Sequence, residues 1–242
     1  IMAAICAVPL LTGFNNSALG RCALISNTEG DKNTSIGMST LRCNLTGCSN
    51  TAVGYTALLK NTASNNTAVG CGALICNTSG TGNAAVGAEA LDANTTASYN
   101  TAVGKSSLTA NTTGAANTAV GFSALKTNTE GANNVAMGCG ALCLNSTGAG
   151  NTAIGRNTMC ANTTGSNNTS IGLQALLANT EGDNNVAIGK QALDANTTAD
   201  NNTAVGTSAL TANTTGTGNN AFGALAACLL YTSDAADDGL SV

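Results

Sequence analysis

A 17-residue repeat runs through almost the whole chain and constrains its fold more than any other feature. The consensus is N-T-A-V-G-x-x-A-L-x-x-N-T-x-G-x-N, and we number its slots from the Val/Ile position as zero. This anchor recurs thirteen times, and eleven of the twelve spacings are 17 residues while one is 16. The anchors are Leu19, Ile36, Val53, Val69, Val86, Val103, Val120, Met137, Ile154, Ile171, Ile188, Val205 and Phe222. A unit this short cannot enclose a core of its own, so neighbouring copies must pack together.

The residue types in the repeat favour extended structure over helix. Glycine, two asparagines and several threonines recur in every copy, and all of them are poor helix formers. Val, Ile and Thr gather just before the glycine and indicate a short strand such as 100–103. We therefore expect an all-β fold, a parallel β-solenoid of the β-roll or β-helix type, with one coil per repeat and about 13 coils.

Two apolar rows are the candidate core. One is the row of anchors, and the other is the residue at slot +5, which is leucine from Leu24 to Leu210 except for Met159. We expect both rows to point into the solenoid, because burying apolar side chains is the main favourable term in folding.

Glycine at slot +1 and asparagine at slot +8 are predicted to shape the coil. Glycine allows a corner where φ is positive or another backbone comes close. Stacked asparagines can bond through their amides from coil to coil. The predicted corner glycines are Gly54, Gly70, Gly87, Gly104, Gly121, Gly138, Gly155, Gly172, Gly189 and Gly206. The predicted ladder comprises Asn61, Asn77, Asn94, Asn111, Asn128, Asn145, Asn162, Asn179, Asn196 and Asn213, and slot −3 carries a second row of asparagines.

The one short repeat and the charges indicate the outer surface. The repeat between Val53 and Val69 has lost a residue, which places a tolerant loop at slots +10 to +13. Charged residues also recur at slots +2 and +6, so those faces are expected to be solvated.

The ends of the chain differ from the array at 14–227. Residues 1–13 are either a degenerate first coil or the remnant of a signal peptide, and no stretch is long enough to span a membrane. The tail 228–242 breaks the repeat. Its segment Cys228 to Asp237 resembles the translation of a sequencing adaptor, which predicts a non-native tail from an assembled environmental reading frame.

Composition argues against an enzyme. Histidine, the commonest general base and metal ligand, is absent, and the few carboxylates fall mostly in the loops. We expect no catalytic site, no cofactor and no metal site. The net charge is −4, and eight basic residues spread along a rod do not predict nucleic-acid binding.

Ten cysteines do not recur as metal-binding pairs. Only Cys143 and Cys160 share one slot, +6, in adjacent coils, where stacking predicts a separation compatible with a disulfide. The alternative is that cysteine is a small apolar filler.

Threonine or serine fills slot +9 in all complete repeats but the one with Leu45. A regular threonine row on a flat face can order water, so an ice-binding or surface-binding solenoid is an alternative function. This hypothesis predicts one flat, threonine-rich face without charge.

The repeat string seen from Asn100 to Gly121 resembles the repeats of bacterial and phage tail-fibre-domain proteins. It is also similar to the shorter N-S-x-A-I-G repeats in the heads of trimeric autotransporter adhesins. The resemblance implies an extracellular shaft of a virion or cell-surface fibre that attaches to a host surface. It further implies a homotrimer joined by a C-terminal domain missing here, with a receptor or glycan as partner.

Overall fold

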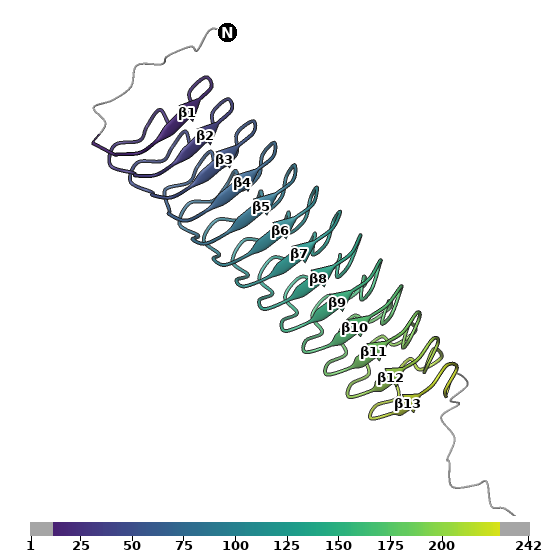
Figure 1. Ribbon diagram of the computed structural model, residues 1–242. Helices are drawn as coiled ribbons and strands as arrows, with labels where there is room; N and C mark the ends of the chain where they lie inside the picture. The colour runs from purple at the N-terminus through teal and green to yellow at the C-terminus, as the bar shows by residue number, and fades with distance from the viewer. Residues whose placement is uncertain (1–11, 228–242) are drawn as a thin grey trace, which may run out of the picture.

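The computed structural model describes residues 12–227, and these form thirteen three-residue strands in one parallel sheet (Figure 1). The strands are β1 Ser17–Leu19, β2 Thr34–Ile36, β3 Thr51–Val53, β4 Thr67–Val69, β5 Ala84–Val86, β6 Thr101–Val103, β7 Thr118–Val120, β8 Val135–Met137, β9 Thr152–Ile154, β10 Thr169–Ile171, β11 Val186–Ile188, β12 Thr203–Val205 and β13 Asn220–Phe222. Residues 1–11 of the N-terminal segment 1–13 and the whole tail 228–242 lie outside the described residues.

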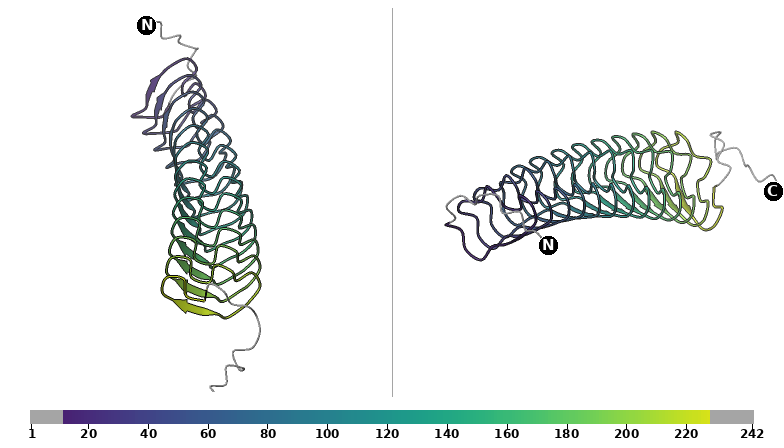
Figure 2. Two further views of the ribbon diagram at one scale, coloured as in Figure 1. Left: turned by 90° about the vertical axis from the view of Figure 1, so that its right-hand side faces the viewer. Right: turned by 90° about the horizontal axis from the view of Figure 1, so that it is seen from above.

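Each repeat is one coil of a parallel β-solenoid, as the sequence predicts. The sheet order is sequential from β1 to β13, and each strand pairs with the same slots of the next, as Ala102 does with Ala119. Residues 12–227 contain no helix. Figure 2 shows the sheet along one side of a gently bowed rod, with the turns on the other sides.

The predicted inward direction of the anchors was wrong. The middle residue of each strand from β2 to β13, at slot −1, is buried, whereas the anchor at slot 0 points outward. Val103 is 37% exposed and Met137 is 42% exposed, while Ala102 and Ala136 are fully buried. Successive strand residues alternate between the two faces, so only one of the two rows can point inward.

The core is a narrow column of leucine and alanine. The +5 residues from Leu41 to Leu210, including Met159, are fully buried, as predicted. They pack with the alanines at slot −1 and with the small residues at slot +4, for example Ala124. One large apolar side chain per coil fills this column, so the coil is thin.

The +1 glycines form the corner after each strand. Their φ angles lie between 120° and 141°, a region that only glycine adopts without strain. Gly121 has a φ of 133°, and a Cβ there would lie 2.6 Å from the carbonyl oxygen of Gly138 in the next coil. Conformation and close approach therefore both require glycine.

Three further positions per coil have left-handed backbone, which the sequence analysis missed. They are slots −4, +3 and +5. Asparagine and glycine are frequent at slot −4, where this conformation costs them little. The +5 leucines adopt it too, with φ of 51° at Leu108, and there it costs roughly 1–2 kcal/mol. Complete burial of the leucine offsets that cost.

We predict that Gly121→Ala destabilises the rod more than Gly72→Ala, by roughly 1–3 kcal/mol. Gly72 occupies slot +3, where other coils carry Ser106 and Ser123 at a similar positive φ, and a Cβ there would meet nothing within 4 Å. Thermal unfolding followed by circular dichroism measures both variants. Equal losses of stability would contradict the corner role of Gly121.

Candidate functional site

Two rows of asparagine run through the interior beside the leucine column. The rows occupy slots −3 and +8, and their members are 0–1% exposed from Asn27 to Asn202. Because a buried primary amide is costly unless it is hydrogen-bonded, these side chains must find partners inside the coil.

In the coils that begin at Asn16 to Asn185, both amides donate to one backbone carbonyl at slot +11. In the coil of Asn202 only Asn213 does so, and the buried Nδ2 of Asn202 has no partner. In the coil 100–116, Asn100 Nδ2 lies 3.0 Å and Asn111 Nδ2 lies 2.9 Å from the carbonyl oxygen of Gly114. Because one carbonyl accepts from both amides, it connects slots −3, +8 and +11 and closes the coil.

Between coils, the same amides form two ladders. At slot +8, Asn111 Nδ2 donates to Asn94 Oδ1 at 3.0 Å, and Asn128 Nδ2 donates to Asn111 Oδ1 at 2.9 Å. At slot −3, the backbone N–H of Asn117 donates to Asn100 Oδ1 at 2.9 Å. Both asparagines of this coil therefore bond within the coil and with a neighbouring coil.

The predicted asparagines all lie in the +8 row, but one bond is missing at the short repeat. Asn61 Nδ2 donates to the carbonyl of Ala63 at 2.7 Å, and the buried Oδ1 of Asn44 has no partner. Ala63 takes the place of the slot +11 residue, so the missing residue lies between Asn61 and Ala63.

The outward residues of the sheet form a surface that we call the strand face, defined as slots −2 and 0 of β1 to β13. Eight strands present Thr at −2 and Val or Ile at 0, namely β2, β3, β4, β6, β7, β9, β10 and β12. The strand face carries no charged residue in the thirteen strands of residues 12–227. It is the candidate binding surface of the molecule.

The hydroxyl groups of the strand-face threonines are free. Within the described part of the chain, Thr101 Oγ1 and the equivalent atoms at slot −2 have no hydrogen-bond partner. The slot +9 threonines differ, since Thr112 Oγ1 donates to the carbonyl of Thr129 at 3.1 Å and most of that row does the same. The hydroxyls of the +9 row, which was proposed to order water, are therefore used in hydrogen bonds between coils. The available hydroxyls lie on the strand face.

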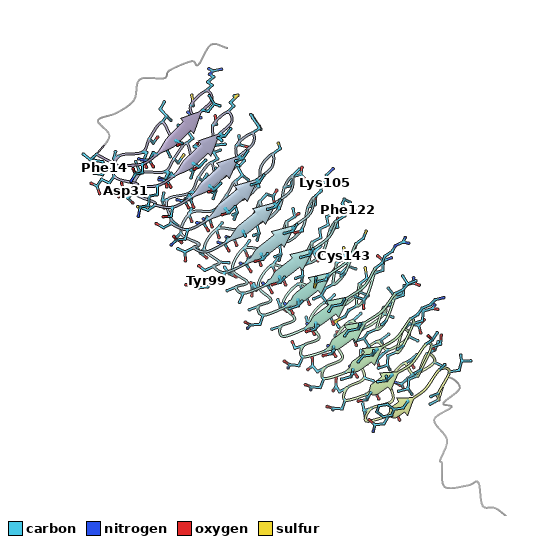
Figure 3. All side chains as sticks on the ribbon, in the orientation of Figure 1. Phe14, Asp31, Tyr99, Lys105, Phe122 and Cys143 are labelled. Atoms are coloured by element: carbon cyan, nitrogen blue, oxygen red, sulfur yellow. The ribbon has the colours of Figure 1, made fainter. Side chains whose placement is uncertain are left out.

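Larger and charged side chains flank the strand face. Figure 3 shows Lys105 and Phe122 beyond the carboxyl ends of the strands and Tyr99 beyond their amino ends. These residues are exposed and occupy the turns. The long, uncharged strip between them can contact a neutral, regularly spaced partner.

Two of the charges expected in solvent are partly buried. Asp92 and Asp194 at slot +6 each have one buried carboxylate oxygen without a partner. Burial raises the pKa of both carboxyl groups, and Glu89 adds to the rise at Asp92. The other charged slots, for example Lys105 at +2 and Glu130 at +10, are exposed as expected.

Cys143 and Cys160 lie in adjacent coils, as the spacing indicates, and both are free, half-buried thiols. Among the described residues, no three His, Cys, Asp or Glu side chains come together as a metal site. Nor does this part of the chain contain a helix long and apolar enough to cross a membrane.

No protein-family model, no curated protein and no solved structure matches this chain.

We predict that Asn111→Ala destabilises the protein more than Thr109→Ala. The first change removes three hydrogen bonds and leaves buried groups of Asn94 and Asn128 with fewer partners, at roughly 1–3 kcal/mol for each unsatisfied group. Thr109 has one long bond, 3.3 Å to the carbonyl of Glu89, near the surface. Denaturant unfolding compares the two, and similar midpoints would contradict the structural role of the ladder.

We predict that Asp194→Asn raises the melting temperature at pH 7 and leaves it nearly unchanged at pH 3. Because the folded pKa of Asp194 is raised, the folded state favours the protonated carboxyl. Its contribution is therefore most favourable at low pH and is lost as pH rises through the folded pKa. Melting curves recorded from pH 3 to pH 7 test this prediction, and Glu130→Gln in an exposed loop is the control. A stabilisation that is the same at both pH values would contradict the desolvation argument.

Proposed function

We propose that this chain is a non-enzymatic shaft segment of an extracellular fibre, either a phage tail fibre or a bacterial surface adhesin, that serves attachment to a host surface. The observation that carries the proposal is the uniform bonding between coils. The slot −3 ladder repeats from Asn16 to Asn219 with N···O distances of 2.8–3.0 Å. A rod bonded in the same way at each step suits the transmission of force along its axis.

The proposed fibre is a homotrimer, and the strand face is the surface through which its three shafts pack. Rows of exposed Val and Ile side chains, such as Val103 and Ile171 at 37% and 36%, would lose their contact with water there. The absence of charge on these thirteen strands avoids repulsion between identical surfaces. In this proposal a further domain joins the three chains, and contacts with a receptor or glycan lie elsewhere in the intact protein.

A second candidate function is binding to ice, and the free hydroxyls of the strand face favour it. Along the rod, equivalent residues repeat at about 4.8 Å, and slots −2 and 0 of one strand lie about 6.6 Å apart. This two-dimensional grid of hydroxyl and methyl groups repeats regularly along the rod, so it can order a layer of water molecules. Free Thr101 and Thr118 hydroxyls can bond to such a lattice, and Val103 and Val120 can pack into its hollows.

One pair of variants tests both candidates. Val120→Lys places a charge on the strand face, and Thr113→Lys places the same charge at the exposed slot +10 of the neighbouring coil as a control. We expect that fusing a trimerising coiled coil after Ala227 produces a trimer. Val120→Lys should lower the melting temperature of this trimer, and Thr113→Lys should not. Light scattering gives the mass of each species.

Shaft packing and ice binding predict different outcomes for these variants. Shaft packing is contradicted if the two variants of the fusion have the same melting temperature and small-angle scattering shows three separate rods. Ice binding predicts that the unfused monomer produces thermal hysteresis, which Val120→Lys abolishes and Thr113→Lys preserves. A folded monomer without thermal hysteresis contradicts ice binding.

A further inference from the structure

A pair of stacked thiols occupies slot +6 on the turn side of the rod. Lys126, Cys143 and Cys160 follow one another at this slot in three consecutive coils. Each cysteine is half-buried and adjoins a fully buried core residue, Leu142 or Met159. The two thiols are therefore fixed by their coils and remain open to a small molecule.

Backbone hydrogen bonds hold the two cysteines in register. The N–H of Leu144 donates to the carbonyl of Cys160 at 3.0 Å, and the N–H of Thr127 donates to the carbonyl of Cys143 at 3.1 Å. Neighbouring coils at strand spacing, about 4.8 Å apart, fall within the Cα separation that a disulfide tolerates, about 4.4–6.8 Å. The Cα spacing between the two coils therefore permits a bond between the two sulfurs.

The two sulfurs have different proton affinities. A hydrogen bond from the Cys160 thiol lowers the pKa of Cys143 to about 6, and the charge of Lys126 adds to this effect. The same hydrogen bond raises the pKa of Cys160. Lys126 in the preceding coil and Cys160 in the following coil are the charged and titratable groups that shift the pKa of Cys143.

We propose that Cys143 and Cys160 form a dithiol site for small disulfide oxidants, in which Cys143 attacks, Cys160 resolves, and the product is a bond between adjacent coils. The free pair in the structure is the reduced form of this site. The site deepens the disulfide hypothesis drawn from spacing, because it assigns a different role to each thiol.

The reaction balances in two exchange steps. The Cys143 thiolate attacks one sulfur of the oxidant, the oxidant's S–S bond breaks, and one thiolate leaves and takes a proton from water. Cys160 then loses its proton and attacks Cys143 Sγ, so the mixed disulfide breaks and a second small thiol leaves. Two protein thiols are oxidised, and one small disulfide is reduced to two thiols.

Oxidised glutathione is the probe, and peptide mass spectrometry of the full chain is the readout. We expect wild-type protein to yield a peptide that links Cys143 to Cys160, without glutathione on either. In Cys160→Ala, Cys143 should keep one glutathione, because the resolving thiol is gone. In Cys143→Ala, Cys160 loses the hydrogen bond to Cys143 but keeps the rise in pKa from burial, so at pH 6 it should take up glutathione more slowly than Cys143 does in Cys160→Ala.

The pH dependence of the first step distinguishes an activated Cys143 thiolate from two ordinary thiols that only lie close together. At pH 6 a thiol of pKa 6 is half ionised, and after allowance for its weaker nucleophilicity it reacts roughly tenfold faster than an ordinary cysteine. Cys160→Ala removes the hydrogen-bond donor, so the reaction of Cys143 at pH 6 should slow severalfold and its midpoint should move to higher pH.

Cys76 is the matched control within the same chain. Its Sγ lies 4.0 Å from Lys60 Nζ, but the same slot of the next coil holds Ala93 in place of a second thiol. Cys76 should therefore carry glutathione whenever it reacts, and it should form no link between coils. The proposal is overturned if wild-type Cys143 also retains glutathione, if Cys160 is modified first, or if the pH midpoint of Cys143 is unchanged in Cys160→Ala.

Discussion

Two buried asparagine amides that share one backbone carbonyl hold each coil together. The carbonyl of Gly114 accepts from Asn100 and Asn111, and the Oδ1 atoms of these two residues accept from the next coil. The leucine column could slide along the rod axis at little cost, because hydrophobic contact is not directional. Hydrogen bonds are directional, so the amides set the register of one coil on the next. Sheet pairing, core stacking and the regular strand face all follow from that register.

Much of the fold could be predicted from the sequence, because the 17-residue repeat specifies the structure of every coil. The coil length, the parallel stacking, the buried +5 row and the glycine corners depend on residues that recur in the same slot. The direction of the anchors could have been predicted too. Slots −3 and 0 are three residues apart, so an inward Asn100 requires an outward Val103 on the same strand. The hydrophobicity of valine favours the interior, but the alternation of the strand decides its direction.

Other features could not be obtained from residue types alone. Threonine stands at both slot −2 and slot +9, yet Thr112 donates to the next coil and Thr101 has a free hydroxyl, because only the first lies opposite a carbonyl. The left-handed backbone at Leu108 is equally hidden, since leucine rarely adopts it and gives no local signal. The partial burial of Asp194 depends on how closely the turns pack at slot +6. Each of these follows from three-dimensional proximity between coils.

The short coil shows why the array has two ladders. The missing residue between Asn61 and Ala63 removes the slot +8 bond to Asn44, whose Oδ1 is left buried without a partner. The slot −3 ladder passes this point unchanged, with the N–H of Asn66 3.0 Å from Asn50 Oδ1. The strands on either side also keep their pairing, Ala52 with Ala68. The −3 ladder and the backbone hydrogen bonds between coils therefore maintain the register of the sheet across this coil, and the strand face continues without a step. Changes in length are tolerated on the side of the +8 ladder, where the turns lie, and the side that carries the candidate binding surface stays regular.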